Sequence, residues 1–277
     1  ILPDLTIDES LEVTKIYSVS SLLKNKNSLI TKRPFRSPHH TTSYSALVGG
    51  GRIPKPGEVS LSHNGVLFLD ELPEFNKNVL EVLRQPLEDK QVTVSRANAT
   101  ITYPTNFLLL ASMNPCPCGY YGSSDKCNCT QNEISKYLGK ISGPLLDRID
   151  IQVESSFVEY DDLSNLSISE SSEVIKGRVN RARELQDERY KYINKKNPIR
   201  TNSELTTSLI EEFCILGIDE QNILKQAFNS LNLSARAYHK ILKVARTIAD
   251  LDNEEKINVK HIAEAISYRS LDRKYWQ

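Results

Sequence analysis

The stretch Gly65–Leu72 reads Gly-Val-Leu-Phe-Leu-Asp-Glu-Leu, so that four apolar residues run directly into a pair of carboxylates. An apolar run without polar alternation is typical of a parallel strand that is buried on both faces. The carboxylates would then lie at the carboxyl edge of the sheet, where α/β folds bind ligands. This predicts Walker B chemistry, in which Asp70 holds Mg²⁺ through water and Glu71 orients or deprotonates the water that attacks the γ-phosphate. The alternative is an ordinary strand followed by an acidic helix cap.

A second continuous apolar run, Phe107–Ala111, predicts another buried strand. Asn114 follows this run, and parallel strands present their carboxyl ends at one edge of a sheet. We therefore expect Asn114 at the same edge as Asp70 and Glu71. The alternative is a plain Asn-Pro turn, which Pro115 favours by itself.

Several further motifs carry a family resemblance. They are Arg-Pro-Phe-Arg-Ser-Pro-His-His-Thr (Arg33–Thr41), Leu-Val-Gly-Gly-Gly (Leu47–Gly51), Pro-Lys-Pro-Gly-Glu-Val-Ser-Leu (Pro54–Leu61), Ser-Met-Asn-Pro-Cys-Pro-Cys-Gly (Ser112–Gly119), Ser142–Asp150 and Ser234–Leu251. With Gly65–Leu72 they resemble the magnesium-chelatase-like AAA+ ATPases, and within these the ComM/YifB group of bacterial competence-related proteins. The resemblance covers nearly the whole chain. It implies an α/β fold, with an AAA+ P-loop-type core over residues 1–156 and an all-α lid, or magnesium-chelatase-like C-terminal domain, over residues 157–277.

The phosphate-binding loop of that family is missing from this sequence, which contains no Gly-x-x-x-x-Gly-Lys-Ser/Thr motif. The chain opens at Ile1-Leu-Pro-Asp-Leu-Thr, which resembles family sequence just downstream of that loop. Because the loop's amides and lysine cradle the phosphates, we expect a fragment that is truncated at the N-terminal end of the core and is inactive alone. We likewise expect the fragment to lack the family's N-terminal Lon-protease-like domain. The parent is expected to be an ATPase that uses ATP and Mg²⁺.

The resemblance also implies roles for single residues. Asn114 matches sensor 1, whose amide can bond the γ-phosphate or the attacking water. Arg236, at the start of Ser234–Leu251, matches the sensor 2 arginine, which contacts the γ-phosphate. An unremarkable surface arginine is the alternative for Arg236.

Arg148 matches the arginine finger that is presented to the nucleotide of the neighbouring subunit. A planar guanidinium there can neutralise charge on the transferred phosphoryl group. That role would require a ring or head-to-tail oligomer, which we expect to be a hexamer. An ion pair with Asp147 or Asp150 is the alternative.

Two hairpins are candidates for DNA contact. Gln91–Tyr103 alternates as a strand pair around Ala97-Asn98 and resembles the hairpin before sensor 1, with Arg96 near its tip. The glycine- and proline-rich stretch before it predicts a short hairpin of Arg52-Ile53 with Glu58-Val59, and by resemblance it is the helix-2 insert. Arg96, Arg52 and Lys55 are the candidate phosphate contacts, although an exposed basic residue is often only solubilising.

The pairs Cys116-Pro-Cys118 and Cys127-Asn-Cys129 form a cluster, and the segment between them contains Gly119 and Gly122. Such a cluster can offer four sulfur ligands to a structural Zn²⁺, and zinc is favoured over free thiols or a disulfide in a reducing compartment. Cys214 is expected to be a buried core thiol.

Composition is consistent with these predictions. The 277 residues are 39% hydrophobic and 25% charged, as in ordinary globular domains, and the formal net charge is zero. Any DNA binding must therefore come from local patches. No run approaches the ~18 apolar residues of a membrane span, and we expect a cytoplasmic protein without membrane contact. Adjacent residues seldom both ligate one ion, so His39 and His40 are expected to contact substrate or form a simple turn.

Periodicity predicts the remaining elements. The expected helices are 8–24, Asn76–Glu88, Ser169–Tyr192, Glu204–Leu216, Asp219–Leu231, Ser234–Leu251 and Val259–Tyr268, and alternation predicts a strand at Ile149–Val153.

Three functions remain open. The first is a ComM-like motor for DNA branch migration or helicase action in natural transformation and recombination. The second is a metal-insertion ATPase of the magnesium chelatase type, against which the Cys-Pro-Cys cluster argues. The third is a non-catalytic zinc-bearing DNA-binding module.

Overall fold

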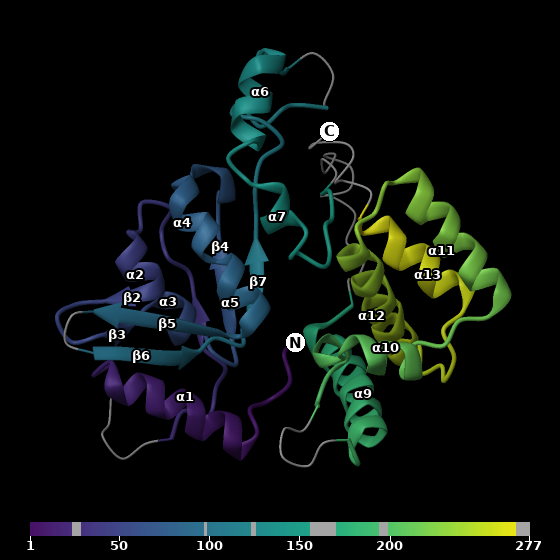
Figure 1. The fold of residues 1–277 in the computed structure, drawn as a ribbon, viewed down its shortest axis with the longest axis horizontal. Coiled ribbons are helices and arrows are strands. Elements are labelled where there is room, and N and C mark those ends of the chain that lie inside the picture. Colours follow the sequence, from purple (N-terminus) through teal and green to yellow (C-terminus); the bar gives the residue numbers. More distant parts are fainter. Residues whose placement is uncertain (24–28, 97–98, 123–125, 156–169, 194–198, 270–277) are drawn as a thin grey trace. The chain divides into compact units, whose positions relative to one another are not determined.

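A computed structural model describes residues 1–23, 29–96, 99–122, 126–155, 170–193 and 199–269. The chain divides into two compact units, one of residues 4–149 and one that begins at Asp150 and also includes Ile1–Pro3 (Figure 1). The predicted boundary at 156/157 falls outside the described residues and stays a prediction. No helix in the described ranges has the length and apolar character needed to cross a bilayer.

The centre of the first unit is a parallel sheet in the order β1-β4-β7. Strand β4 (Val66–Leu69) pairs with β1 (Phe35–Arg36) on one side and with β7 (Leu108–Ala111) on the other. Leu67 and Leu69 are fully buried. The mixed α/β class and the buried central strand predicted from Gly65–Leu72 are therefore confirmed.

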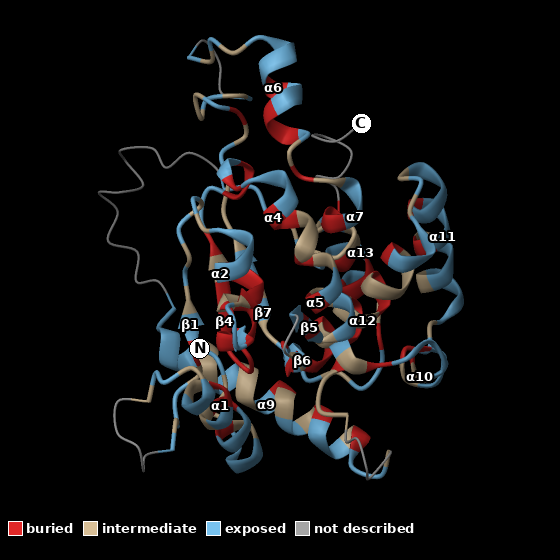
Figure 2. Cartoon of the chain, turned by 60° about the vertical axis from the view of Figure 1, so that its left-hand side comes forward, coloured by how far each residue is buried: buried red, intermediate tan, exposed pale blue. Residues whose placement is uncertain are grey.

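Burial of the sheet differs between its strands (Figure 2). Leu108 and Leu110 of β7 are about half exposed, at 52% and 49%, and Phe35 of β1 is 61% exposed. The prediction of a strand at Phe107–Ala111 is confirmed, but the expected burial on both faces is wrong. Within the described residues, the hydrophobic core covers mainly the face that carries Leu109 and Ala111.

Short helices supply the rest of the first unit's core. They are α1 (Ile7–Val19), α2 (Tyr44–Val48), α3 (Glu58–Leu61), η1 (Leu72–Glu74), α4 (Lys77–Val82), α5 (Arg84–Asp89), α6 (Gln131–Leu138) and α7 (Gly143–Leu146). The predicted helix 8–24 ends early, at Val19, and its Leu11 is exposed whereas Val13 and Ile16 are buried.

The single helix predicted over Asn76–Glu88 is wrong, since the chain breaks into α4 and α5 at Leu83. The Leu83 amide donates to the Leu80 carbonyl at 3.1 Å, and the Leu87 amide donates to the Leu83 carbonyl at 3.1 Å. Pro86 has no amide hydrogen and cannot continue an α-helical ladder from Val82. Restarting the helix at Arg84 places Pro86 in a first turn, where amides have no intrahelical partner anyway.

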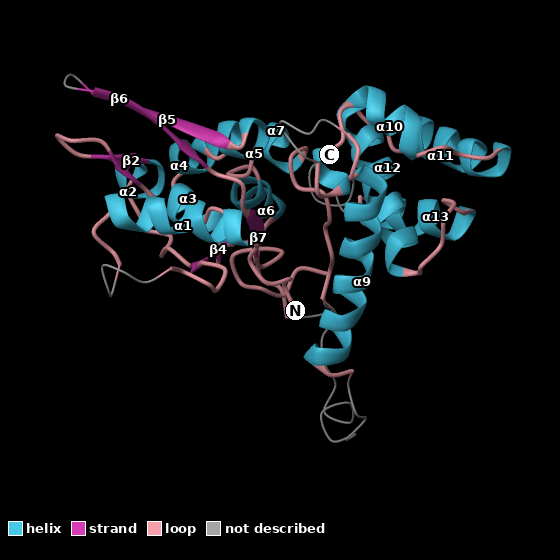
Figure 3. Ribbon diagram, turned by 90° about the horizontal axis from the view of Figure 1, so that it is seen from below, coloured by secondary structure: helices cyan, strands magenta, loops and turns pink. Residues whose placement is uncertain are grey.

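Two hairpins extend from the first unit (Figure 3). Strands β5 (Gln91–Arg96) and β6 (Ala99–Pro104) pair in the predicted antiparallel register, with Arg96 opposite Ala99, and the predicted tip at 97–98 lies outside the described residues. The shorter hairpin consists of β2 (Gly49–Gly50) and β3 (Lys55–Pro56).

The predicted pairing of Arg52-Ile53 with Glu58-Val59 is wrong, because the glycines themselves form β2 and Glu58 begins α3. The reason is steric. A Cβ atom on Gly57 would lie 2.4 Å from the Gly49 nitrogen, so this close backbone approach requires glycine.

The second unit is helical throughout its described elements. They are α9 (Ser172–Tyr190), η2 (Asn202–Glu204), α10 (Thr207–Phe213), α11 (Ile218–Ser230), α12 (Ala235–Leu251) and α13 (Val259–Ser267). The predicted strand at Ile149–Val153 is wrong, because no strand forms there and Val153 is 75% exposed. The Gln152 amide instead donates to the Tyr268 carbonyl at 3.0 Å, just beyond the end of α13.

Candidate functional site

Asp70 lies directly after β4 and is held by a serine that follows β7. One oxygen of its carboxylate, Oδ1, accepts hydrogen bonds from the Ser112 hydroxyl and, at 3.0 Å, from the Glu71 amide. The Ser112 amide also donates to the Leu69 carbonyl at 3.1 Å, and the Leu72 amide donates to the Ser112 carbonyl at 2.9 Å. Within the described residues the other carboxylate oxygen, Oδ2, has no hydrogen-bond partner. This oxygen could accept from a water bound to Mg²⁺.

Sequence reasoning missed Ser112 as a contributor to this site. The available signal was its position, one residue beyond an apolar strand that was expected to pair with the acidic one. Its hydroxyl orients the Asp70 carboxylate, and its main chain keeps the ends of β4 and β7 in register.

Glu71 has an unusual backbone and an unexpected partner. Its φ of 53° places it in the left-handed region, which a residue other than glycine rarely adopts. Nδ1 of His40 lies 3.1 Å from Oε2 of Glu71, and the His40 ring lies 4.1 Å from the ring of His39. Such strain often persists where a side chain must be held in a particular direction. His40 is therefore a residue of the site, a role that the sequence alone left open.

Asn114 is exposed and follows β7 by three positions. It lies two residues beyond Ser112, whose hydroxyl contacts Asp70. A Cβ atom placed on Gly119 would lie 3.9 Å from the amide carbon of Asn114, which is ordinary van der Waals contact. Asn114 thus lies in the chain between Ser112, which contacts Asp70, and the cysteine loop, while its role toward phosphate stays a prediction.

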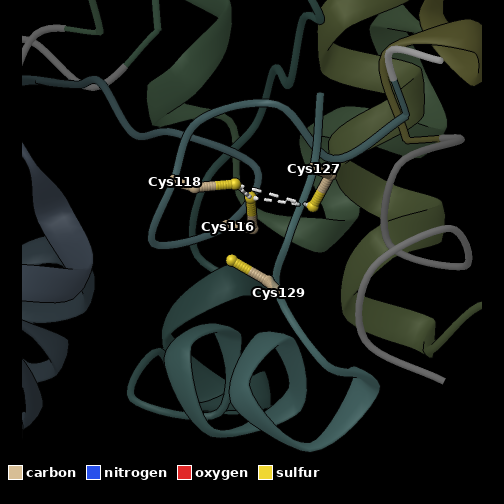
Figure 4. Close-up of side chains that lie close together, drawn as sticks. All are labelled: Cys116, Cys118, Cys127 and Cys129. Carbon is tan, nitrogen blue, oxygen red and sulfur yellow. Dashed lines mark hydrogen bonds between the residues drawn. The ribbon is translucent and has the colours of Figure 1, made fainter. Parts of the chain in front are cut away.

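The four clustered cysteines point toward one another (Figure 4). The Cys116 sulfur lies 3.3 Å from that of Cys118 and 3.8 Å from that of Cys127, and the Cys118 and Cys127 sulfurs are 3.6 Å apart. All four sulfurs, including that of Cys129, lie within 4.8 Å of one another. Tetrahedral coordination with Zn–S bonds of ~2.3 Å requires sulfurs about 3.8 Å apart, so the arrangement fits a four-coordinate ion.

The pKa values within the cluster differ. The amide of Tyr120, with help from the Cys116 thiol, lowers the pKa of Cys118 to about 6. The hydrogen bond with Cys118 raises the pKa of Cys129 to about 12. Four thiolates this close repel one another, and a bound cation is what allows all four to ionise. None of the five cysteines, all of which lie in the described residues, forms a disulfide, and Cys214 is buried as expected.

Arg148 is held within its own unit. Its Nε donates to the Arg84 carbonyl at 3.1 Å, one Nη donates to the Pro144 carbonyl at 2.7 Å, and the other forms an ion pair with Glu88 of α5. Only 11% of its side chain is exposed. An arginine finger acting on a neighbouring subunit would have to exchange the Glu88 contact for phosphate.

Arg236 is an exposed residue in the first turn of α12, which belongs to the second unit. The Ser234 hydroxyl caps this helix by accepting from the Ala237 amide at 3.1 Å.

The candidate DNA contacts lie on the two hairpins, which pack together in Figure 1. The Tyr103 hydroxyl of β6 donates to the Pro54 carbonyl at 2.8 Å and ties the hairpins to each other. Arg96, Arg52 and Lys55 are exposed, and none of them forms an ion pair with a carboxylate in the part of the chain that the structure describes. Unneutralised cations on a fixed platform can contact a phosphate backbone.

Asp252, Glu254 and His261 form a second group of possible metal ligands, but their contacts do not require a metal. The ammonium group of Lys260 lies 2.8 Å from Asp252 and 2.7 Å from Glu254, so a protein cation already forms ion pairs with both carboxylates.

Comparison with known sequences identifies the family. Residues 1–163 match the family described as magnesium chelatase, subunit ChlI, and residues 169–269 match its C-terminal domain. The chain is 46% identical over 276 residues to the competence protein ComM of Haemophilus influenzae, and 45% identical over 274 residues to the uncharacterized protein YifB of Escherichia coli. Each alignment covers 99% of this chain and 52% of the relative. An uncharacterized protein of Mycobacterium tuberculosis is 39% identical over 97% of this chain and 52% of its own length.

The chain therefore spans about half the length of the curated relatives it matches. It belongs to the magnesium chelatase ChlI family of AAA+ ATPases and is a homologue of ComM and YifB.

Proposed function

We propose that this chain is part of an ATP-driven motor that moves branched or single-stranded DNA. The observation that carries the proposal is the edge formed by Asp70, Glu71 and Asn114, in which a strained glutamate lies beside an aspartate with one uncommitted carboxylate oxygen. Because the chain belongs to this family, we expect such an edge to bind ATP and Mg²⁺. The name of the ComM relative, a competence protein, supports DNA as the substrate.

Each residue has a defined part in the proposed reaction. Mg²⁺, bound through water to Asp70, would neutralise charge on the phosphates. Glu71 orients or deprotonates the attacking water, and the contact with His40 fixes the orientation of the Glu71 carboxylate. The Asn114 amide bonds the γ-phosphate or that water, and Arg236 contacts the γ-phosphate. Arg148 acts on the nucleotide of a neighbouring subunit, so the working assembly is a ring, which we propose to be a hexamer.

The remaining features fit this function. Zn²⁺ bound by Cys116, Cys118, Cys127 and Cys129 would be structural, since four sulfur ligands leave no open position. The hairpin cations Arg96, Arg52 and Lys55 contact the DNA backbone without reading its sequence.

The test is ATP hydrolysis by the full-length gene product, purified with and without branched and single-stranded DNA. We expect stimulation by DNA, and we expect Glu71→Gln to abolish turnover while it preserves ATP binding. The variant Arg96→Ala should weaken DNA binding and lower its salt dependence, and Lys15→Ala, on α1 outside both hairpins, is the matched control.

The other outcomes refute the proposal in distinct ways. If the rate of ATP hydrolysis does not change with DNA but changes with a tetrapyrrole, the protein functions in metal insertion instead. DNA binding without any hydrolysis would assign a non-catalytic module. Loss of ATP binding in Glu71→Gln would make Glu71 structural rather than catalytic.

A further inference from the structure

The cysteine cluster adjoins the proposed ATPase edge in the chain. Asn114 is followed by Pro115, which restricts the backbone, and then by Cys116, whose side chain is fully buried. The loop then turns back at Gly119, whose φ is 82°, and the Gly119 amide donates to the Cys116 carbonyl at 3.0 Å. A Cβ atom built on Gly119 would lie 3.9 Å from the amide carbon of Asn114, so this turn brings the backbone at Gly119 near the Asn114 side chain.

Burial of the described residues does little to order this loop. Among the described residues from Asn114 to Thr130, Cys116 is the only buried one. A loop with one small buried side chain loses conformational entropy on ordering and gains little from burial. The four sulfurs are the groups that converge, so an ion bound to them is the interaction that can hold this loop closed.

The far side of the cluster is attached to the same edge. Helix α6 begins at Gln131, two residues after Cys129, and buries Ile134, Tyr137 and Leu138. Burial, together with the negative charges of Glu74, Cys116 and Glu71, raises the pKa of the Tyr137 hydroxyl to about 12. Beyond α6, Lys140 forms an ion pair with Glu74 at 3.4 Å, in the turn after Glu71.

We propose that metal bound at Cys116, Cys118, Cys127 and Cys129 positions Asn114, so that metal occupancy controls turnover rather than nucleotide binding. The inference rests on the proposed ATPase function. Asn114 would touch the reacting phosphate, whereas the cysteines act only through it and are positioning residues. Loss of the ion opens the loop, removes Gly119 from Asn114 and leaves the amide group without a fixed direction.

The experiment compares the zinc-loaded full-length protein with the same protein after chelation and after reloading with Zn²⁺. We expect kcat to fall by about tenfold on chelation and to recover on reloading. Displacement of a catalytic group by about 1 Å can lower the rate by more than this. Binding of a non-hydrolysable ATP analogue should change by less than about threefold, because misdirecting one amide acts on the transition state more than on the ground state.

Variants test whether the effect passes through Asn114. Cys127→Ser should reproduce the chelated state, and Cys214→Ala, which removes a thiol outside the cluster, is the matched control. In an Asn114→Ala background, Cys127→Ser should cost no further activity, because the residue it positions is already gone. A further full loss in the double variant would overturn the proposal, as would unchanged kcat in metal-free protein.

A structural readout separates this inference from the ATPase proposal. In the 277-residue chain, metal removal should speed hydrogen exchange of the amides from Ser112 to Gly119 but not those of β4. If the full-length protein proves to have no ATPase activity, the proposed function fails, and this exchange pattern alone decides the coupling. Absence of bound Zn²⁺ or Co²⁺ in the purified chain, or unchanged exchange, would refute the inference.

Discussion

Asp250→Ala should destabilise the helical unit severely. Asp250 lies near the end of α12 and is 1% exposed. Its Oδ2 accepts from Arg189 at 3.0 Å, from Asn202 at 2.8 Å and from Gln186 at 3.2 Å, while Oδ1 accepts from Arg189 and, at 3.2 Å, from Arg246. One carboxylate therefore serves two guanidinium groups and two amides.

The magnitude follows from what the substitution leaves behind. Arg246 is 3% exposed and, among the described residues, would keep as partners for its charge the carbonyls of Glu254 and Glu255. Breaking a buried ion pair by removal of one partner costs about 3–5 kcal/mol. Because 20% of the Arg189 side chain is exposed to solvent, we expect the loss of stability to lie at the lower end of this range, about 3 kcal/mol. For a unit of this size that loss lowers Tm by about 10 °C.

Thermal and urea unfolding followed by far-UV circular dichroism measures the loss, and hydrogen exchange assigns it to α9 and α12. The control is Asp252→Ala, since this carboxylate is 43% exposed and its ion pair with Lys260 should contribute less than about 1 kcal/mol. If the free energy of unfolding of Asp250→Ala lies within about 1 kcal/mol of the wild-type value, water or rearrangement must satisfy both arginines. The buried ion pairs of Asp250 would then not stabilise the helical unit as expected.

Three further predictions concern the first unit. Glu71→Gly should relieve the left-handed backbone and raise the free energy of unfolding by about 1 kcal/mol, measured in urea, while it abolishes turnover in the full-length protein; a loss of stability would mean that the backbone is not strained. Burial lowers the pKa of His63, and Glu12 opposes this shift only in part. As the pH falls, His63 is therefore protonated in the unfolded chain before it is protonated in the folded chain. Stability should therefore fall as the pH drops below about 6.5, and His63→Gln should remove this slope; an unchanged slope would assign it to another group. Tyr103→Phe leaves the buried Pro54 carbonyl without its 2.8 Å donor and should cost about 1–2 kcal/mol in urea unfolding, with DNA affinity reduced in the full-length protein; an unchanged stability would mean that water replaces the hydroxyl.

Several features followed from the sequence because their determinants are local. The apolar run before Asp70 predicts a buried strand from its composition alone, and the alternation over Gln91–Tyr103 predicts a hairpin from its period of two. The spacing of the four cysteines likewise indicates a common ligand set, because a short loop with glycines can bring them together. The helical second unit follows from strong periodicity, as in α12.

Other features were decided only by tertiary contacts. The pairing of Gly49 with Pro56 depends on how closely one backbone can approach another, which no pattern of hydrophobicity records. The half-exposed face of β7 depends on which helices cover the sheet. The contacts of His40 with Glu71 and of Ser112 with Asp70 join residues 31 and 42 positions apart in the chain. A sequence specifies which side chains can form such contacts, but the folded backbone determines which of them meet, because that depends on three-dimensional distance rather than on spacing along the chain.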